Sequence, residues 1–520
     1  MRNKESANGG SKMKKRAVFL ALLISLAALC ACNGGNRGKK GSDDEVSAVV
    51  GITQDLDSLD PHKAVAAGTD EVLFNVFEGL VKPSVDGTLV PAVAKDYTIA
   101  PDGTAYTFVL RENIKFHNGA PVTADDVVYS IKRCAGLLAD PDPEVVVESA
   151  LSVISSVEKE GEDTVVITLS EPNTELLAFL TCAIIPEDYT EQESKPVGTG
   201  PFQFVSYTPL SDFVMERFED YYGERAYLDK VTFKICASTD AAFMELLAGG
   251  IDIFPYLTEE QASQLTEEYS LEVGASNLVQ AMFLNNDFAP FQDVRVRQAL
   301  CYGVNKQELL NIVSGGRGHI IGSNMFPNFG VYYEASLENY YTFQPEKAKE
   351  LLADAGYNES NPLRFTMKVP SNYDFHVATA QVLADQYGKI GVKAEIQLIE
   401  WSAWLTEVYR SREYEATIVG LDSVMAPSDV LKRYSSQAAN NFVNYKSERF
   451  DELFAKALAS TAESEKAAYY KEIQTLLTED AASVYLQDAA KLVAVSKKFT
   501  NFLFYPVYVL DMASLRPAEE

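Results

Sequence analysis

Hydrophobic and polar residues alternate in several short segments of the chain, whereas other segments repeat their hydrophobic residues every three or four positions. Alternation is typical of a β-strand with one buried face, and the longer spacing is typical of an amphipathic helix. The alternating segments, which are rich in β-branched and aromatic residues, are 106–110, 164–169, 231–235 and 393–399. Helices interspersed with such strands predict a mixed α/β architecture.

Several of the expected helices have residues that mark their ends. A helix is predicted from Pro345 to Ala355, because proline suits a first helical turn and Gly356 provides the end. Asp240 is placed to cap a second helix, and Asp293 is placed to cap a third. These boundaries predict short helices that alternate with the strands along the chain.

The residues that follow the third cap predict which face of that helix is buried. We expect Val294, Val296 and Leu300 to pack inward, because their spacing places them on one side of a helix. We expect Arg295 and Arg297 to reach outward into solvent, since charged side chains are seldom fully buried.

The N-terminus has the layout of an export signal. A basic patch precedes a thirteen-residue apolar run from Ala17 to Leu29, which is too short for a stable membrane anchor. The small residue Ala31 before Cys32 predicts a lipoprotein signal over residues 1–31, with Cys32 carrying the lipid. Cys30 fits this role less well because bulky Leu29 precedes it, and an ordinary cleaved signal with incidental cysteines is the alternative.

The residues between the signal and the first strand lack any apolar face. Residues 32–45 are rich in glycine, lysine and other polar residues, so we expect a flexible tether that links the lipid to a folded body. The remaining chain is longer than one hydrophobic core usually organises, and two or three lobes are therefore expected. This layout predicts a protein held at the extracytoplasmic face of a bacterial cell membrane.

The charge and composition of the chain argue against some classes of binding partner. The formal net charge is −29, and a surface of that sign repels nucleic acid and anionic lipid headgroups. Apart from the signal, the sequence has no apolar run long enough for a transmembrane helix. We therefore expect a soluble body, a membrane contact through the N-terminal lipid, and no nucleic-acid partner.

Residues suited to covalent chemistry are scattered along the sequence. There is no nucleophile elbow, phosphate-binding loop, zinc-protease motif or dinucleotide fingerprint. The cysteines that follow the signal are isolated in sequence and lack metal-ligand spacing, so we interpret them as free buried thiols: Cys134, Cys182, Cys236 and Cys301. No catalytic residue, metal site or cofactor is predicted.

Four stretches of the sequence, taken together, point to one protein family. The segments 114–130 (IKFHNGAPVTADDVVYS), 196–202 (PVGTGPF), 285–300 (NNDFAPFQDVRVRQAL) and 355–357 (AGY) occur in an order and at separations that fit this family. The chain resembles the bacterial extracellular solute-binding proteins of the oligopeptide and dipeptide family, over nearly the whole body. Most of these motif residues are expected to hold the scaffold.

The resemblance implies a periplasmic-binding-protein-like α/β fold with two hinged lobes and an inserted third domain. The implied parts are lobe I (46–80, 195–284 and 483–520), the inserted domain II (81–194) and lobe III (285–482). Lobes I and III would close over a ligand, because a ligand that contacts both lobes only in the closed state favours that state.

The resemblance also implies partners and a role. The chain would be a monomeric substrate-binding lipoprotein that captures short peptides and delivers them to the permease and ATPase subunits of an ABC importer. A surface hydrolase is a competing class, although no catalytic constellation supports it. A sensor or adhesin that feeds no permease would share the same sequence features.

The sequence departs from the peptide-binding members of the family at one informative place. In those proteins an aspartate on the third lobe pairs with the peptide's α-amino group, and the matching position here is Ser423. Asp422, one residue earlier, is the nearby side chain that could supply the charge. A buried ammonium without its carboxylate would cost about 2 to 5 kcal/mol. Either Asp422 substitutes through a shifted loop, or the ligand is a nickel chelate, an oligosaccharide, glutathione or a modified peptide.

Other residues are candidates for the walls of the same cleft. The two tryptophans of the chain are three residues apart and could share one side of a helix, where ring stacking or core packing would use them. A tyrosine loop could form the rim, and a glycine-rich loop could pass close to the ligand. The candidate ligand-binding residues are Gly420, Leu421, Asp422, Ser423, Trp401, Trp404, Tyr373 and Thr199.

Overall fold

A computed structural model of the protein describes residues 45–519, and the predicted lipidation site Cys32 lies outside these residues. The body from Val46 onward is one compact unit. No helix among residues 45–519 is long and apolar enough to cross a lipid bilayer.

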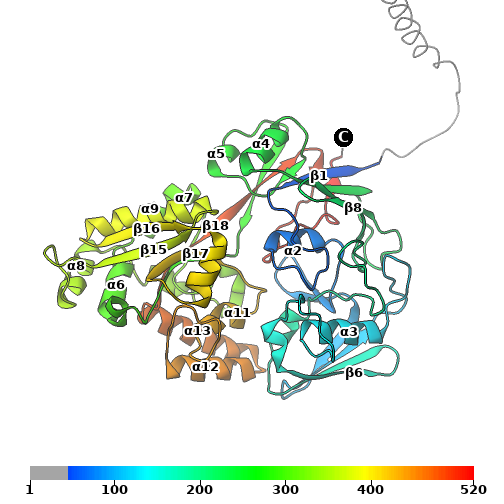
Figure 1. Cartoon of the computed structure of the whole chain (residues 1–520), viewed down its shortest axis with the longest axis horizontal. Coiled ribbons are helices and arrows are strands. Elements are labelled where there is room, and N and C mark those ends of the chain that lie inside the picture. The colour runs from blue at the N-terminus through cyan, green and yellow to red at the C-terminus, as the bar shows by residue number, and fades with distance from the viewer. Residues whose placement is uncertain (1–44, 520) are drawn as a thin grey trace, which may run out of the picture. The chain divides into compact units, whose positions relative to one another are not determined.

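One strand close to the C-terminus, β18 (Ser483–Ser496), joins the two halves of a twelve-stranded sheet (Figure 1). The half around β1 contains β1 (Ser47–Ile52), β8 (Phe202–Thr208), β9 (Asp212–Arg217), β10 (Lys230–Ile235), β11 (Ile253–Phe254) and β12 (Tyr269–Ala275). The half around β17 contains β13 (Val279–Leu284), β14 (Gly318–Ile320), β15 (Arg364–Pro370), β16 (Lys393–Ile399) and β17 (Ala416–Leu421).

The sheet combines parallel and antiparallel pairs. β1 runs parallel to β10 and β11, and β15 runs parallel to β16 and β17. β18 runs antiparallel to β13 through Gln487 and antiparallel to β12 from Ala490 onward. The chain therefore passes from the β1 half to the β17 half at 276–278 and returns within β18 at 488–489.

A separate antiparallel sheet is formed inside segment 81–194. Its strands, in spatial order, are β4 (Ala94–Ile99), β5 (Ala105–Leu110), β7 (Thr164–Leu169) and β6 (Ile154–Glu160), with the short pair β2 (Val81–Pro83) and β3 (Leu89–Pro91) nearby. Alternate residues of β5 and β7 are buried, because one face of each strand packs in a common core. We call this part of the chain the inserted module.

Helices cover the sheets in both parts. In the β17 half, α9 packs against β15, β16 and β17, and α12 packs against α13. The helices are α2 (Ala67–Leu73), α3 (Ala124–Cys134), α4 (Thr239–Leu247), α5 (Glu259–Ala262), α6 (Val294–Tyr302), α7 (Lys306–Ser314), α8 (Pro345–Asp354), α9 (Asp374–Lys389), α10 (Trp401–Ala403), α11 (Pro427–Leu431), α12 (Glu448–Ala459) and α13 (Glu463–Glu479). A π-helical turn (Trp404–Arg410) continues α10.

The four segments with alternating residues are strands, so the mixed α/β prediction is confirmed. The predicted helix that begins at Pro345 is α8, with Ala348 and Leu352 buried. The predicted cap Asp293 does cap α6, because its side chain accepts a hydrogen bond from the backbone N–H of Arg295 at 2.9 Å.

Three expectations about individual helix residues were wrong. Ser238, and not Asp240, caps α4, since its hydroxyl accepts the N–H of Ala241, while Asp240 lies in the first turn. Val294 is 38% exposed rather than packed inward. Arg297 is buried, because its guanidinium donates to the backbone carbonyls of Phe291 and of residues 480 and 481, which satisfies its charge without solvent.

Candidate ligand-binding site

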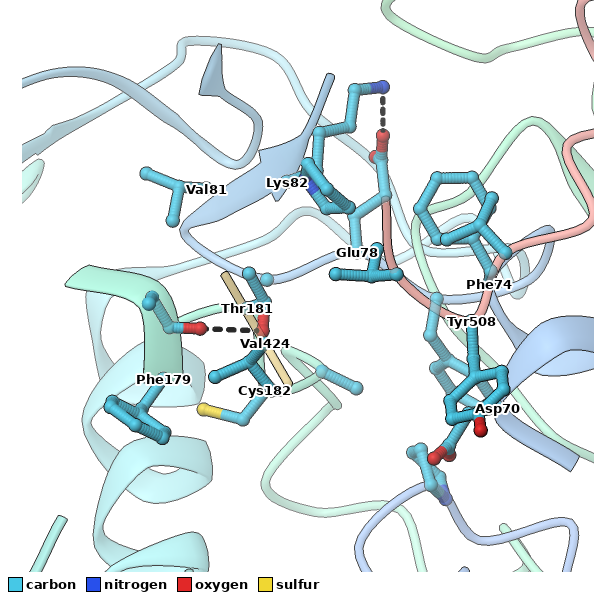
Figure 2. Close-up of a pocket in the computed structure, with 18 of the residues that line it drawn as sticks. Asp70, Phe74, Glu78, Val81, Lys82, Phe179, Thr181, Cys182, Val424 and Tyr508 are labelled. Atoms are coloured by element: carbon cyan, nitrogen blue, oxygen red, sulfur yellow. Dashed lines mark hydrogen bonds and ion pairs between the residues drawn. The ribbon is translucent and has the colours of Figure 1, made fainter. Parts of the chain in front are cut away.

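A cavity of about 380 Å³ lies where the inserted module, helix α2 and the loop after β17 meet (Figure 2). Residues from four distant parts of the chain line it: 61–89, 134–148, 178–183 and 422–425, together with the C-terminal segment 507–509. A cavity of this size accommodates a small ligand and combines apolar walls with a few polar groups.

The apolar walls come mainly from the segment after α2 and from the inserted module. These side chains are Leu73, Phe74, Phe77, Val81, Ala178, Phe179, Val424, Met425, Val507 and Val509. Some of these residues also belong to the hydrophobic cores that hold the surrounding elements, so the wall is fixed by packing rather than by loops alone.

Two carboxylates from distant elements line the cavity. Asp70 comes from α2, and Asp422 comes from the loop after β17, on the other half of the large sheet. Both are accessible from inside the cavity although protein surrounds them. Neither side chain has a hydrogen bond or ion pair with another of the described residues, which leaves both free for a ligand.

Burial and mutual repulsion change the protonation of this pair. Burial, together with the nearby charges of Asp57, Asp422 and Glu71, raises the pKa of Asp70 to about 7. Burial also raises the pKa of Asp422. Burial and the negative charge of Asp422 raise the pKa of Tyr508, which Figure 2 shows beside Asp70. A cation placed here would relieve this repulsion.

The neighbouring acidic side chains already have cationic partners. Glu78 pairs with Lys82 at 2.7 Å and accepts a hydrogen bond from the Tyr221 hydroxyl at 2.7 Å (Figure 2). Glu71, which is 1% exposed, pairs with Lys491 at 2.7 Å. Glu78 and Glu71 therefore hold these two lysines, which leaves Asp70 and Asp422 without an ion-pair partner.

The candidate stretch after β17 is divided between cavity and scaffold. Asp422 and Ser423 line the cavity, and the Ser423 hydroxyl donates to the carbonyl of Ala426 at 3.3 Å. Gly420 and Leu421 belong to β17 and do not line this cavity. The N–H of Gly420 donates to Nε2 of His376 at 3.1 Å, which holds the end of the strand in place.

The tryptophans and Tyr373 form an aromatic stack outside the cavity wall. The Trp401 and Trp404 rings are 4.9 Å apart and nearly parallel, and Tyr373 meets Trp401 edge to face at 5.6 Å. Trp404 is buried, and its indole N–H donates to the Thr417 hydroxyl at 2.9 Å, which indicates a packing role. Tyr373 is 42% exposed, so it remains accessible to a ligand that extends beyond the cavity.

The remaining candidate, Thr199, lies beneath the cavity. Its side chain is fully buried, and its hydroxyl is 3.5 Å from a carboxylate oxygen of Glu78, which does line the cavity. A Cβ at Gly198 or Gly200 would lie 2.2 to 2.6 Å from the carbonyl oxygens of Val76 and Asn75. The glycines are thus required for close approach of this loop to the segment after α2.

Sequence reasoning missed Asp70, Phe74, Glu78 and Tyr508 as cavity residues. Asp70 lies in the first turn of a helix, where an acidic residue is ordinary, so its sequence position carries no separate signal. Tyr508 follows β18 by several residues in a segment without regular structure. These residues meet only through contacts between distant segments of the chain.

A buried carboxylate joins the inserted module to the β17 half beside the cavity. Glu175 accepts a hydrogen bond from the Tyr470 hydroxyl of α13 at 2.5 Å and from the Ser428 N–H of α11 at 2.9 Å. Nearby, Thr174 donates to the carbonyl of Ser460 at 3.0 Å. We call Thr174 and Glu175 with these partners the clasp.

A second buried carboxylate lies where β18 passes from one half of the sheet to the other. Asp488 accepts the N–H of Leu278 at 3.0 Å, and Leu278 belongs to the other passage between the halves. Its second oxygen, Oδ2, is buried and has no hydrogen-bond partner. Burial raises the pKa of Asp488 to about 7.

Within residues 45–519, no three histidine, cysteine or acidic side chains gather as the ligands of a metal ion would. The cavity therefore offers hydrophobic surface, two unpartnered carboxylates and a tyrosine, a set that suits non-covalent binding of a cationic, partly apolar molecule.

The family model for bacterial extracellular solute-binding proteins, family 5 middle, matches residues 88–442. The chain belongs to this family. Family 5 proteins bind solutes outside the cytoplasm, so the predicted resemblance and the extracytoplasmic location are confirmed. The family is one of binding proteins.

Known proteins that match most of the chain include a heme-binding and an oligopeptide-binding protein. Heme-binding protein A of Haemophilus influenzae is 27% identical over 485 residues, which cover 84% of this chain and 85% of that protein. Oligopeptide-binding protein AppA of Bacillus subtilis is 25% identical over 541 residues, which cover 95% of this chain and 97% of that protein.

A solved structure shares the fold. The ABC transporter-associated periplasmic binding protein DppA from Helicobacter pylori, in complex with the peptide STSA, matches with a TM-score of 0.79 and 25% identity, covering 91% of this chain and 99% of that one. This match confirms the predicted periplasmic-binding-protein-like α/β fold. Relatives of this chain thus include proteins named for peptides and one named for heme.

Proposed function

We propose that this family 5 protein captures short peptides with a free amino terminus and delivers them to the permease and ATPase subunits of an ABC importer. The observation that carries the proposal is the position of Asp422, which lines the cavity without a partner. The names of an oligopeptide-binding relative and of a peptide complex with the same fold support a peptide ligand.

Asp422 takes the role of amine anchor in this proposal. Ser423 stands at the position where peptide-binding members of the family have their aspartate, and its hydroxyl donates to a backbone carbonyl. An ammonium group in the cavity would meet the carboxylate of Asp422, with Asp70 also in the lining. A charge-assisted hydrogen bond in a site with little water is stronger than one in bulk solvent.

Closure of two lobes would trap the ligand. We assign lobe I to residues 46–80, 195–284 and 483–520, domain II to residues 81–194, and lobe III to residues 285–482. The cavity residues Asp70 and Asp422 belong to lobes I and III in this division, so a ligand between them favours the closed state. The two passages of the chain at 276–278 and 488–489 would be the hinge.

Lipidation of Cys32 would hold the protein at the membrane, with residues 32–45 as a tether that keeps a monomeric body near the permease. A lipid anchor of this kind raises the effective concentration of the receptor at its partner. The expected location is the outer face of the cytoplasmic membrane of a bacterium.

A non-peptide solute with a cationic group is the alternative ligand. The observation that favours it is Ser423, because the family's amine-pairing aspartate is replaced there. A relative of similar identity to this chain is named for heme and not for a peptide. The two candidates differ in whether a free α-amino group is needed.

The test begins with native mass spectrometry of protein purified without refolding, which identifies any co-purified ligand. Calorimetry then compares short peptides that have a free amino terminus with the same peptides N-acetylated. We expect binding only with the free amine, and Asp422→Asn should weaken it by about tenfold or more. Asp385→Asn, which removes an exposed carboxylate of α9 outside the cavity, is the matched control.

Equal affinity for free and acetylated peptides would show that the site does not recognise a free α-amino group. A co-purified non-peptide solute, together with no peptide binding by calorimetry, would replace the peptide proposal with the alternative. Unchanged affinity in Asp422→Asn would remove Asp422 from the site while leaving the peptide ligand in place.

A further inference from the structure

Two cysteines that are far apart in the sequence meet in the wall of the ligand cavity. Cys134 is the last residue of α3, and Cys182 lies in the loop after the short helix Leu176–Phe179. Both line the cavity and pack in the same hydrophobic core, and Cys182 is the neighbour that most raises the pKa of Cys134. Figure 2 draws Cys182 and its neighbour Thr181 in this wall. All four cysteines of the body are free, as expected, and Cys182 is half-buried rather than fully buried.

The other two cysteines of the body have different surroundings. Cys236 and Cys301 do not line this cavity, and their thiols point to the carbonyls of Lys234 and Ser483. No disulfide joins any of these cysteines in the structure of residues 45–519. The paired arrangement thus distinguishes Cys134 and Cys182 from the remaining thiols.

The backbone on both sides of the pair is fixed by hydrogen bonds. The carbonyl of Cys134 accepts the N–H of Glu148 at 3.0 Å. The residue after Cys182, Ala183, offers its carbonyl to Nε2 of His62 at 2.8 Å, and the N–H of Ile184 donates to the carbonyl of Glu78 at 2.8 Å. These bonds fix the backbone beside each of the two cysteines.

The two thiols differ in access. Cys182 is half-buried and faces the cavity, whereas Cys134 is 5% exposed. The neighbouring Cys182 and burial raise the pKa of Cys134 well above its usual value. The accessible thiol therefore reacts first with a small molecule, and the buried thiol follows. Family 5 proteins work outside the cytoplasm, where disulfides form and persist.

We propose that Cys134 and Cys182 form a redox-active pair that a low-molecular-weight disulfide converts to a cystine in the cavity wall. In the first step the deprotonated Cys182 sulfur attacks the small disulfide, forms a mixed disulfide and releases one thiolate. In the second step Cys134 loses its proton and its sulfur attacks the Cys182 sulfur. The intramolecular bond forms, the second thiolate leaves, and the small disulfide is thereby reduced to two thiols.

This bond would change the ligand site directly. It would link the end of α3 to the loop that carries Ala178, Phe179 and Thr181, which all line the cavity. The proposal concerns the chain's own thiols and holds whichever solute the cavity accepts.

Differential alkylation of the full-length chain tests the proposal. The reduced protein is incubated with an excess of oxidised glutathione, remaining thiols are alkylated, and peptide mass spectrometry reports each cysteine separately. We expect a linked peptide pair that contains Cys134 and Cys182, with a mass lower than that of the two reduced peptides by two hydrogen atoms. Cys236 and Cys301 should stay open to alkylation after unfolding.

Single variants separate the two steps. Cys134→Ser should accumulate a mixed disulfide between glutathione and Cys182, because the resolving thiol is absent. Cys182→Ser should leave Cys134 reduced, and the control Cys301→Ser should form the linked pair as the wild type does. Circular dichroism confirms that each variant folds, and the alanine variant at the same position replaces any serine variant that does not.

Two results would overturn the proposal. In one, wild-type Cys134 and Cys182 both remain fully alkylated after exposure to oxidised glutathione. In the other, wild type and Cys134→Ser give the same stable mixed disulfide at Cys182, so that Cys134 takes no part. Neither result depends on the identity of the transported solute, so the proposed function stands or falls separately.

Discussion

At the scale of single residues, the cavity is defined by which charges have partners. Lys82 and Lys491 are held by Glu78 and Glu71, so they do not neutralise the carboxylates of Asp70 and Asp422. Burial of two such groups near each other disfavours the state in which both are ionised. The pair therefore favours a cation in the cavity and responds to pH in the physiological range.

The pKa of about 7 for Asp70 makes ligand affinity depend on pH. A cationic ligand favours the ionised carboxylate, so below pH 7 a proton must leave Asp70 before the ligand binds well. We expect the affinity for a peptide with a free amine to weaken about tenfold as the pH falls from 7.5 to 5.5. Calorimetry in buffers of different ionisation enthalpy should detect proton release near pH 6.5.

Asp70→Asn is the matched variant for this effect. It should bind more weakly than wild type at pH 7.5 and lose the proton release, while any titration of the peptide amine affects both proteins equally. Parallel pH profiles for wild type and Asp70→Asn would show that Asp70 is not part of the ligand site.

At the scale of elements, the hydrophobic pattern specifies local structure well. The alternation in β5, β7, β10 and β16 predicted strands because each has one face in a core. The cap at Asp293 was predictable because capping is a contact between near neighbours in sequence. Such features depend on residues that are close in sequence, so they can be predicted without the rest of the fold.

Contacts between distant segments could not be predicted in the same way. Arg297 is buried because carbonyls from residues 480 and 481 surround its guanidinium, and no nearby sequence signal reports them. The meeting of Cys134 with Cys182, and that of Asp70 with Asp422, likewise depend on how the inserted module and the sheet halves pack. Asp422 was predicted only because the family resemblance indicated the loop.

Strand β18 places the buried carboxylate of Asp488 at the point where the strand passes between the two halves of the sheet. It pairs with β13 before Asp488 and with β12 after it, and the Asp488 carboxylate holds the opposite passage at Leu278. The unpartnered Oδ2 and the buried setting raise the pKa of Asp488 to about 7. The carboxyl is therefore favoured in its neutral form in the folded protein.

Asp488→Asn should stabilise the protein at high pH. The folded-state pKa of Asp488 lies above its unfolded value near 4, so the wild type loses stability as the pH rises from 4 through 7. An amide keeps the acceptor for Leu278 and has no charge to bury, and we expect a gain of about 2 kcal/mol in the free energy of unfolding at pH 8.

Urea unfolding at pH 5 and pH 8 measures this effect. The difference between Asp488→Asn and wild type should be larger at pH 8, and the exposed control Asp385→Asn should show no such change. If Asp488→Asn were destabilised by the same amount at both pH values, the raised pKa could not be assigned to Asp488.

At the scale of the whole molecule, the inserted module and the β17 half meet beside the cavity through the clasp. Glu175 precedes the cavity residues Ala178 and Phe179 by a few positions, and its partner Ser428 follows Met425. In the proposed closure over a ligand, formation of the clasp would be coupled to the cavity through these short stretches of chain. Contacts that exist only in the closed state raise the affinity for every ligand by the same factor.

Small-angle X-ray scattering during ligand titration tests the central claim most directly, with wild type and Glu175→Gln measured side by side. If the lobes close over the ligand, the radius of gyration of the wild type should fall when a free-amine peptide binds. In Glu175→Gln it should fall only at higher peptide concentration, by a factor that is the same for different peptides. An identical scattering curve with and without a peptide that calorimetry shows to be bound would contradict capture by closure.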